Sequence, residues 1–153
     1  MPIADAAHIQ EQTDLGDKAA LLAKRRLRRA ERWVRQQIGD DTYSVAIGAT
    51  DLSAVADGDT PSEETLLRED VKDAEALYAA AKALHGHQLG SGGDEGFVRA
   101  IQIDGSQSEQ KMSQAELNAY ADAFEEEARA AIARHMQTGS APLWATMDRF
   151  TDV

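Results

Sequence analysis

Apolar residues recur at helical spacing in three long stretches of the chain. The first stretch, residues 14–38, carries apolar side chains at steps of four, three, four and four, at Ala23, Leu27, Ala30, Val34 and Ile38. This period places them on one face of a helix. Asp14 is suited to cap the start of that helix, and Gly39 is suited to end it.

The second and third stretches each begin with a capping box, in which side chains satisfy the free backbone N–H groups of a helix start. Residues 60–63 read Thr-Pro-Ser-Glu, with proline at the first helical position, and predict a helix that ends near Gly86. Its predicted core face consists of Leu67, Val71, Ala74, Tyr78, Ala81 and His85. Ser113 and Glu116 open the third helix, and Gly139 closes it. Its predicted core face consists of Leu117, Tyr120, Ala121, Phe124, Ala128, Ala131, Ile132 and His135.

Less regular segments separate the helices. Residues 1–13 have no periodicity and predict a flexible arm. Residues 40–60 are acidic and interrupted by glycine, and a short run of alternating apolar residues within them predicts a loop with one short strand. After the glycine-rich residues 90–96, residues 97–112 predict a β-hairpin that turns at an Asp-Gly pair.

This order of elements predicts a mainly α fold: a bundle of three long helices, with a short β-hairpin between the second and third helices and an extended C-terminal arm. A length of 153 residues with 42% hydrophobic content suits a single core. We therefore expect a flexible arm at residues 1–13, a helical domain at 14–136 and a C-terminal docking arm at 137–153.

The C-terminal arm is unusually apolar. After Pro142, four large apolar side chains fall within eight positions, at Leu143, Trp144, Met147 and Phe150. Such a segment either folds back as a lid on its own core or inserts into another protein.

The charge of the chain is strongly negative and unevenly distributed. The net charge is -11. Residues 1–39 hold eight basic and five acidic side chains, whereas residues 40–153 hold eight basic and twenty-two acidic ones. An excess of carboxylates with few lysines is typical of proteins from a high-salt cytoplasm, where ions screen the repulsion. An ordinary acidic protein is the alternative interpretation.

Six of the eight basic residues within residues 1–39 fall in one sector of the first predicted helix, opposite its apolar stripe. The sector contains Lys24, Arg25, Arg28, Arg29, Arg32 and Arg35. Arginine binds both phosphate and carboxylate through its forked donors, so this face predicts contact with the DNA backbone, docking on an acidic protein surface, or simple solvation. A flanking stripe of Leu15, Leu22 and Trp33 predicts a subunit interface, unless Trp33 only covers the edge of its own core.

No segment carries a recognisable catalytic or cofactor motif. The chain has no cysteine, so disulfides and thiolate metal sites are excluded. His85 and His87 form a His-x-His pair, but on a helix they point to different faces and are more simply core-edge residues. The glycine-rich residues 90–96 lack the lysine of a phosphate-binding loop. We expect no enzyme activity, metal or cofactor. We also expect a cytoplasmic product that contacts no membrane, because the chain has no long apolar run and no signal-peptide pattern.

Two segments carry a resemblance to a known family. They are residues 70–84, Asp-Val-Lys-Asp-Ala-Glu-Ala-Leu-Tyr-Ala-Ala-Ala-Lys-Ala-Leu, and residues 96–113, Gly-Phe-Val-Arg-Ala-Ile-Gln-Ile-Asp-Gly-Ser-Gln-Ser-Glu-Gln-Lys-Met-Ser. In hydrophobic pattern and layout over residues 15–150, the chain resembles the head-to-tail connector, or adaptor, proteins of tailed viruses of bacteria and haloarchaea. The family combines a small helical bundle with a hairpin between its later helices and a C-terminal arm that reaches into the portal.

The resemblance implies a structural protein of the virion neck, made in the host cytoplasm. It implies a homo-oligomeric ring of twelve copies between the portal protein and the next tail protein, with genome DNA passing through the channel. The portal-facing anchor would then be Leu143, Trp144, Met147 and Phe150. Two other functions stay open: a small helical regulator that binds the DNA backbone through the basic first helix, and an acidic accessory protein that binds one basic client without forming a ring.

Overall fold

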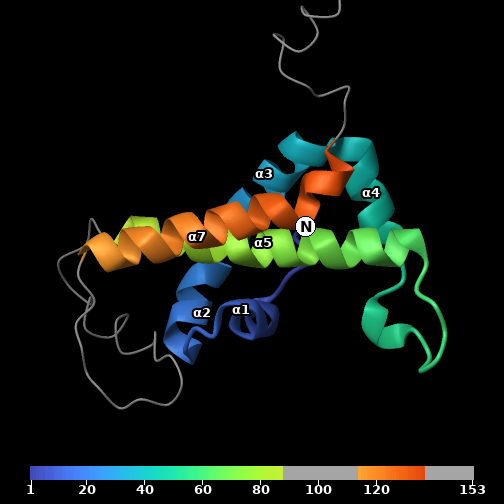
Figure 1. Ribbon diagram of the computed structural model, residues 1–153, viewed down its shortest axis with the longest axis horizontal. Coiled ribbons are helices and arrows are strands. Elements are labelled where there is room, and N and C mark those ends of the chain that lie inside the picture. Colours follow the sequence, from blue (N-terminus) through green and yellow to red (C-terminus); the bar gives the residue numbers. More distant parts are fainter. Residues whose placement is uncertain (88–113, 137–153) are drawn as a thin grey trace, which may run out of the picture.

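The computed structural model describes residues 1–87 and 114–136 (Figure 1). The α-helices in this part are α1 (Ala6–Thr13), α2 (Asp17–Lys24), α3 (Leu27–Ile38), α4 (Asp40–Gly48), α5 (Glu63–His87) and α7 (Gln114–Ile132). Two short 3-10 helices, η1 (Leu52–Ala54) and η2 (Ala133–His135), complete them. The mainly α prediction is confirmed, and these residues contain no strand. The hairpin predicted at 97–112 and the arm predicted at 137–153 lie outside the described residues.

Helix α5 is the centre of the fold and contacts each of the other five described α-helices. It runs antiparallel to α7, with α1 and α2 on one side of this pair and α3 and α4 on the other (Figure 1). Its eight consecutive residues 74–81 are all buried. Five of these eight are alanines, whose small side chains let neighbouring helices approach from every direction. The sequence of α5 therefore explains its central position.

The predicted core faces are largely confirmed. The whole apolar stripe of the first stretch is buried, from Ala23 to Ile38. On α5 and α7, Val71, Leu84 and Ile132 are fully buried, and Tyr120 and Phe124 are partly buried against the core. Burial of a large aliphatic side chain stabilises a fold by roughly 1.5–3 kcal/mol. Burial of these apolar stripes therefore contributes much of the stability of the fold.

The N-terminal segment is not an arm but contains helix α1. Asp5 caps this helix by accepting a hydrogen bond from the backbone N–H of His8 at 2.9 Å. Ile9 is fully buried. Asp14 ends α1 in a left-handed conformation, with φ 54°, and so does not cap the next helix. An eight-residue helix is too short to show the repeated spacing on which the prediction depended.

The single helix predicted at residues 14–38 is in fact two helices, α2 and α3, separated by a turn at Arg25 and Arg26. The backbone N–H of Arg26 donates to the carbonyl of Ala23 at 2.8 Å, which tightens the chain into a 3-10 turn. Ala23 and Leu27 keep a helical step of four across this turn. The apolar pattern therefore gave no sign of the break.

The strand predicted near Tyr43 was also wrong, because residues 40–48 form α4. Tyr43 and Ala46 are buried at helical spacing, whereas Val45 and Ile47 are 48% and 44% exposed. Gly39 ends α3 as predicted, and its φ of 87° lets the chain turn directly into α4. An alternating pattern over so few residues does not distinguish a strand from a short helix.

The boundaries of the two long helices also differ from the prediction. The Oγ of Ser62 accepts the backbone N–H of Thr65 at 3.2 Å, so Ser62 caps α5 and Pro61 precedes the helix. Gly86 does not stop α5, which continues to His87. Helix α7 ends at Ile132, well before the glycine expected to close it, and η2 follows.

Candidate interaction surfaces

The predicted basic face is divided between surface and structural roles. Its five exposed cations are Lys24, Arg25, Arg28, Arg29 and Arg32. Arg35 differs from them. Its Nη2 lies 3.1 Å from the Oε1 of Glu31, its Nη1 lies 3.4 Å from the Oδ1 of Asp40, and its guanidinium lies 4.3 Å from the ring centre of Tyr43. Arg35 therefore joins α3 to α4 and is not a free basic residue.

The five exposed cations are not neutralised within the part of the chain that the structure describes. None of them makes an ion pair or hydrogen bond to a carboxylate there. Arg28 and Arg32 are four residues apart within α3. Like charges at this spacing destabilise a helix by about 0.2–0.5 kcal/mol per pair. A bound anionic group would relieve this repulsion.

Three of these cations face a groove between the N-terminal segment and helices α2 and α3. We call it the basic groove. Its volume is ≈ 910 Å³, and its lining includes Lys24, Arg28 and Arg32, with Ile3 and Leu27 among its apolar residues. The lining also contains two carboxylates, but Glu31 pairs with Arg35 and Asp5 caps α1. The basic groove therefore keeps a net positive charge.

The N-terminal wall of the basic groove is held in place by a buried carboxylate. Glu75 on α5 is fully buried and accepts the backbone N–H groups of Ile3 at 2.8 Å and Ala4 at 2.9 Å. It also accepts a hydrogen bond from the hydroxyl of Tyr43 on α4. Burial raises the pKa of Glu75, although these three donors oppose the rise. Burial and the contact with Glu75 also raise the pKa of Tyr43.

Sequence reasoning did not single out Glu75, although a signal was present. Val71, Glu75 and Tyr78 follow one another at steps of four and three. Glu75 therefore falls on the predicted core face of its helix, where a carboxylate is costly unless it is hydrogen-bonded. A lone acid on an apolar helix face indicates a buried polar contact of this kind.

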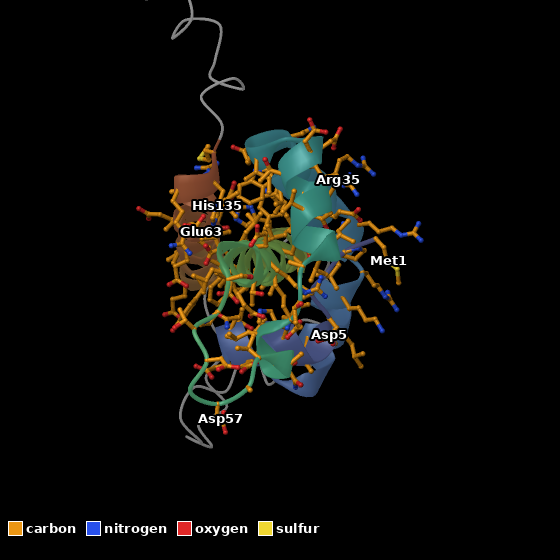
Figure 2. All side chains as sticks on the ribbon, turned by 90° about the vertical axis from the view of Figure 1, so that its right-hand side faces the viewer. Met1, Asp5, Arg35, Asp57, Glu63 and His135 are labelled. Carbon is orange, nitrogen blue, oxygen red and sulfur yellow. The ribbon has the colours of Figure 1, made fainter. Side chains whose placement is uncertain are left out.

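A second, smaller groove lies at the start of α5, beside η2. Its volume is ≈ 420 Å³, and its lining includes Glu63, Glu64, Leu66, Arg134 and His135. Figure 2 shows Glu63 and His135 on one side of the molecule and Arg35 and Met1 on the opposite side. The two grooves are therefore on opposite faces.

The charge of this second groove is negative. Arg134 Nη2 and His135 Nε2 lie 2.6 Å and 2.7 Å from the same oxygen of Asp70, so Asp70 compensates the basic groups. Glu63 and Glu64 are exposed and make no ion pair with any described residue. Leu66, three residues after Glu63, is 37% exposed. We call Glu63, Glu64 and Leu66 the acidic lip.

The predicted subunit-interface stripe does not exist as one exposed surface. Leu15 is buried in the core at 4% exposure. Trp33 stacks on Tyr78, with ring centroids 4.3 Å apart and planes inclined by 10°. Of the three, only Leu22 is exposed, at 36%. Trp33 therefore covers the edge of its own core. The predicted portal-docking residues Leu143, Trp144, Met147 and Phe150 lie outside the described residues.

The described residues bring together no candidate metal site. Within residues 1–87 and 114–136, no three His, Asp or Glu side chains are placed to hold a metal ion. His85 Nε2 lies 3.5 Å from a carboxylate oxygen of Asp122, which places this histidine at the edge between α5 and α7. No helix in these ranges is long and apolar enough to span a membrane. The predictions of no enzyme activity, no metal and no cofactor stay predictions.

Comparison with known proteins identifies no relative of the chain. No family model, no curated protein and no solved structure matches it. The function proposed below therefore combines the resemblance in sequence pattern with the charges and contacts of the described residues.

Proposed function

We propose that this chain is a non-enzymatic assembly protein: a head-to-tail adaptor that forms a ring between the portal and the tail of a tailed virus. One observation supports the proposal most. A groove with unneutralised cations lies on one face of a helical protein whose net charge is -11. Cations without a partner among the described residues leave a surface that an oppositely charged partner can complement on association.

An acidic protein surface is the occupant that best fits the basic groove. Arginine forms paired hydrogen bonds with carboxylates, and the groove combines cations with the apolar side chains of Ile3 and Leu27. A mixed surface of this kind resembles a protein interface, which has an apolar centre and a polar rim. Long DNA would also meet the surrounding acidic surface, which repels phosphate.

A ring with a central channel is consistent with the distribution of charge. Faces of opposite sign on opposite sides of one molecule favour head-to-tail contacts, and such contacts close into rings when the rotation between copies allows it. An acidic channel lining would let genome DNA pass without adhering. In this proposal the portal protein and the next tail protein bind the two ends of the ring, and the protein is located in the virion neck.

The proposal is tested by capture on the portal protein of the same virus. The full-length chain and a variant that ends at Gln137 are each incubated with immobilised portal in high salt. We expect the full-length chain to bind the immobilised portal and the shortened chain not to bind, because the shortened chain lacks the proposed anchor, Leu143, Trp144, Met147 and Phe150. Binding of neither chain would contradict the adaptor function, and equal binding of both would contradict the C-terminal anchor.

A second candidate function is DNA-backbone binding by a small helical regulator. The observation in its favour is that the exposed cations are closely spaced along the end of α2, the turn that follows it, and α3. Phosphate contacts release counterions, so such binding weakens steeply as salt rises. Retention of the free protein on DNA at low salt, together with no capture on the portal, would favour this function.

A further inference from the structure

We propose that the basic groove of one copy receives the acidic lip of a second copy. The inference rests on the proposed function, because it names the contact that joins neighbouring copies in the ring. Two observations support the inference: each groove has charged side chains that are not paired with described residues, and the two grooves lie on opposite faces of the molecule (Figure 2).

The two surfaces are complementary in sign after internal pairing is taken into account. In the basic groove, Glu31 is paired with Arg35, and Lys24, Arg28 and Arg32 keep no partner among the described residues. In the second groove the situation is reversed. Arg134 and His135 are paired with Asp70, and the two glutamates of the acidic lip keep no described partner. Each surface thus presents the charge that the other lacks.

The apolar side chains are also complementary. Glu63 and Leu66 are three residues apart and so share one face of α5. Leu66 is 37% exposed beside these carboxylates. Ile3 and Leu27 line the basic groove next to its cations. Docking of the acidic lip would place Leu66 against this apolar lining and remove its side chain from water. The same docking would place the glutamates of the lip against the arginines of the groove.

The arrangement makes the contact directional. The basic groove and the acidic lip are different surfaces, so each docked copy still presents one of each to a further copy. Such a contact continues until the ring closes. A symmetric dimer would instead use the same surface on both copies. The inference therefore predicts assembly beyond a dimer.

Charge reversal on each side separately provides the test. Arg28→Glu/Arg32→Glu makes the groove acidic, and Glu63→Arg/Glu64→Arg makes the lip basic. All four residues are exposed or partly exposed polar positions outside the core. Far-UV circular dichroism confirms that each variant is folded. Self-association of the full chain is measured by sedimentation velocity and, on the portal, by chemical cross-linking between copies.

We expect each variant alone to associate at least about tenfold more weakly than the wild type, because like charges then face each other. A mixture of the two variants should regain association, since each reversed surface meets a reversed partner. A chain that carries all four changes should also regain it. Arg25→Glu/Arg29→Glu is the matched control: it makes the same change in charge on α2–α3 but away from the groove, and should retain wild-type association.

Three results from the variants would overturn the inference. They are unchanged association in both reversed variants, failure of the mixture to recover, and an equal loss in the control. The adaptor function would survive these results if the portal still captured the wild-type chain. A wild-type chain that shows no contact between copies, free or on the portal, would also overturn the inference. Loss of portal capture by the wild type would overturn the proposed function itself.

Discussion

Glu75 accepts the backbone N–H of Ala4 at 2.9 Å, although 71 residues separate them in the sequence. This contact fixes the N-terminal segment against α5 at a point where neither residue is exposed to solvent. The same carboxylate accepts a hydrogen bond from Tyr43. One buried acid therefore joins the N-terminal segment, α4 and α5, and shapes one wall of the basic groove.

Removal of this carboxylate should be strongly destabilising. Glu75→Ala would leave two backbone N–H groups without their acceptor and the Tyr43 hydroxyl with only the carbonyl of Met1, 3.4 Å away, so the expected cost is ~3 kcal/mol or more. Glu75→Gln retains one acceptor oxygen and nearly the same volume, so it should cost about 1 kcal/mol. Urea unfolding of the two variants measures the difference. Equal and small losses of unfolding free energy in the two variants would show that the hydrogen bonds to Glu75 do not hold the N-terminal segment in place.

The same residue should make stability depend on pH. Burial raises the pKa of Glu75 in the folded state above its ordinary value of 4.5, so the folded protein binds this proton more readily than the unfolded chain. The contribution of Glu75 is then fully present below 4.5 and is lost as the pH rises through the folded-state pKa. Wild type should lose stability relative to Glu75→Gln as the pH rises from 4.5. A difference that is independent of pH would contradict this assignment.

Asp51 should behave in the opposite way. It accepts the backbone N–H of Ser53 at 3.1 Å and lies 3.4 Å from both Arg68 Nε and Lys72 Nζ, and these contacts hold its pKa well below the usual range. A lowered pKa contributes stability above the unfolded value of 3.8, and that stability is lost as the pH falls. Asp51→Asn should cost about 1 kcal/mol at pH 7 and speed amide exchange around η1. Unchanged exchange there would disprove the anchoring role.

Arg32 and Arg35 form a matched pair for separating binding from stability. Arg35→Ala removes the contacts with Glu31 and Asp40 and should cost about 1 kcal/mol, whereas Arg32→Ala should change stability by less than about 0.5 kcal/mol. The proposed interface predicts the reverse order for association, because Arg35 has partners among the described residues and Arg32 has none there. Thermal unfolding and sedimentation of the two variants provide the comparison. Equal loss of association in the Arg32→Ala and Arg35→Ala variants would contradict a specific role of Arg32 in the contact between copies.

Trp33 should matter to the single molecule rather than to assembly. Its ring stacks on Tyr78, so Trp33→Ala should lower the free energy of unfolding by ~2–4 kcal/mol. Leu22→Ala should change it by less than about 0.5 kcal/mol, because Leu22 is on the surface. Urea unfolding at a concentration where the chain is monomeric isolates this effect. A Trp33 variant of normal stability that fails to assemble would restore the subunit-interface interpretation.

The long helices could be predicted from the sequence because their apolar spacing extends over several turns. The buried stripe from Ala23 to Ile38 and the core face of α5 are examples. Helices α1 and α4 were missed because each spans only two to three turns. The break at Arg26 was missed because the step from Ala23 to Leu27 stays helical across it.

The candidate site was predictable only in part. The cations of the basic groove share one sector of a helix, so their spacing revealed them. The pairing of Arg35 with Asp40 depends on how α4 turns back, and local spacing does not contain that information. The acidic lip was not singled out, because Glu63 and Glu64 are ordinary in a chain with twenty-seven carboxylates. Their significance comes from the pairing of their basic neighbours with Asp70.

The most direct test of the adaptor proposal is electron microscopy of the portal protein incubated with the full-length chain. We predict a closed ring of copies below the portal, with the basic groove of each copy turned toward a neighbouring copy or the portal and an acidic surface lining the channel. A portal without added density, or a ring in which Arg28 and Arg32 line the channel, would contradict it.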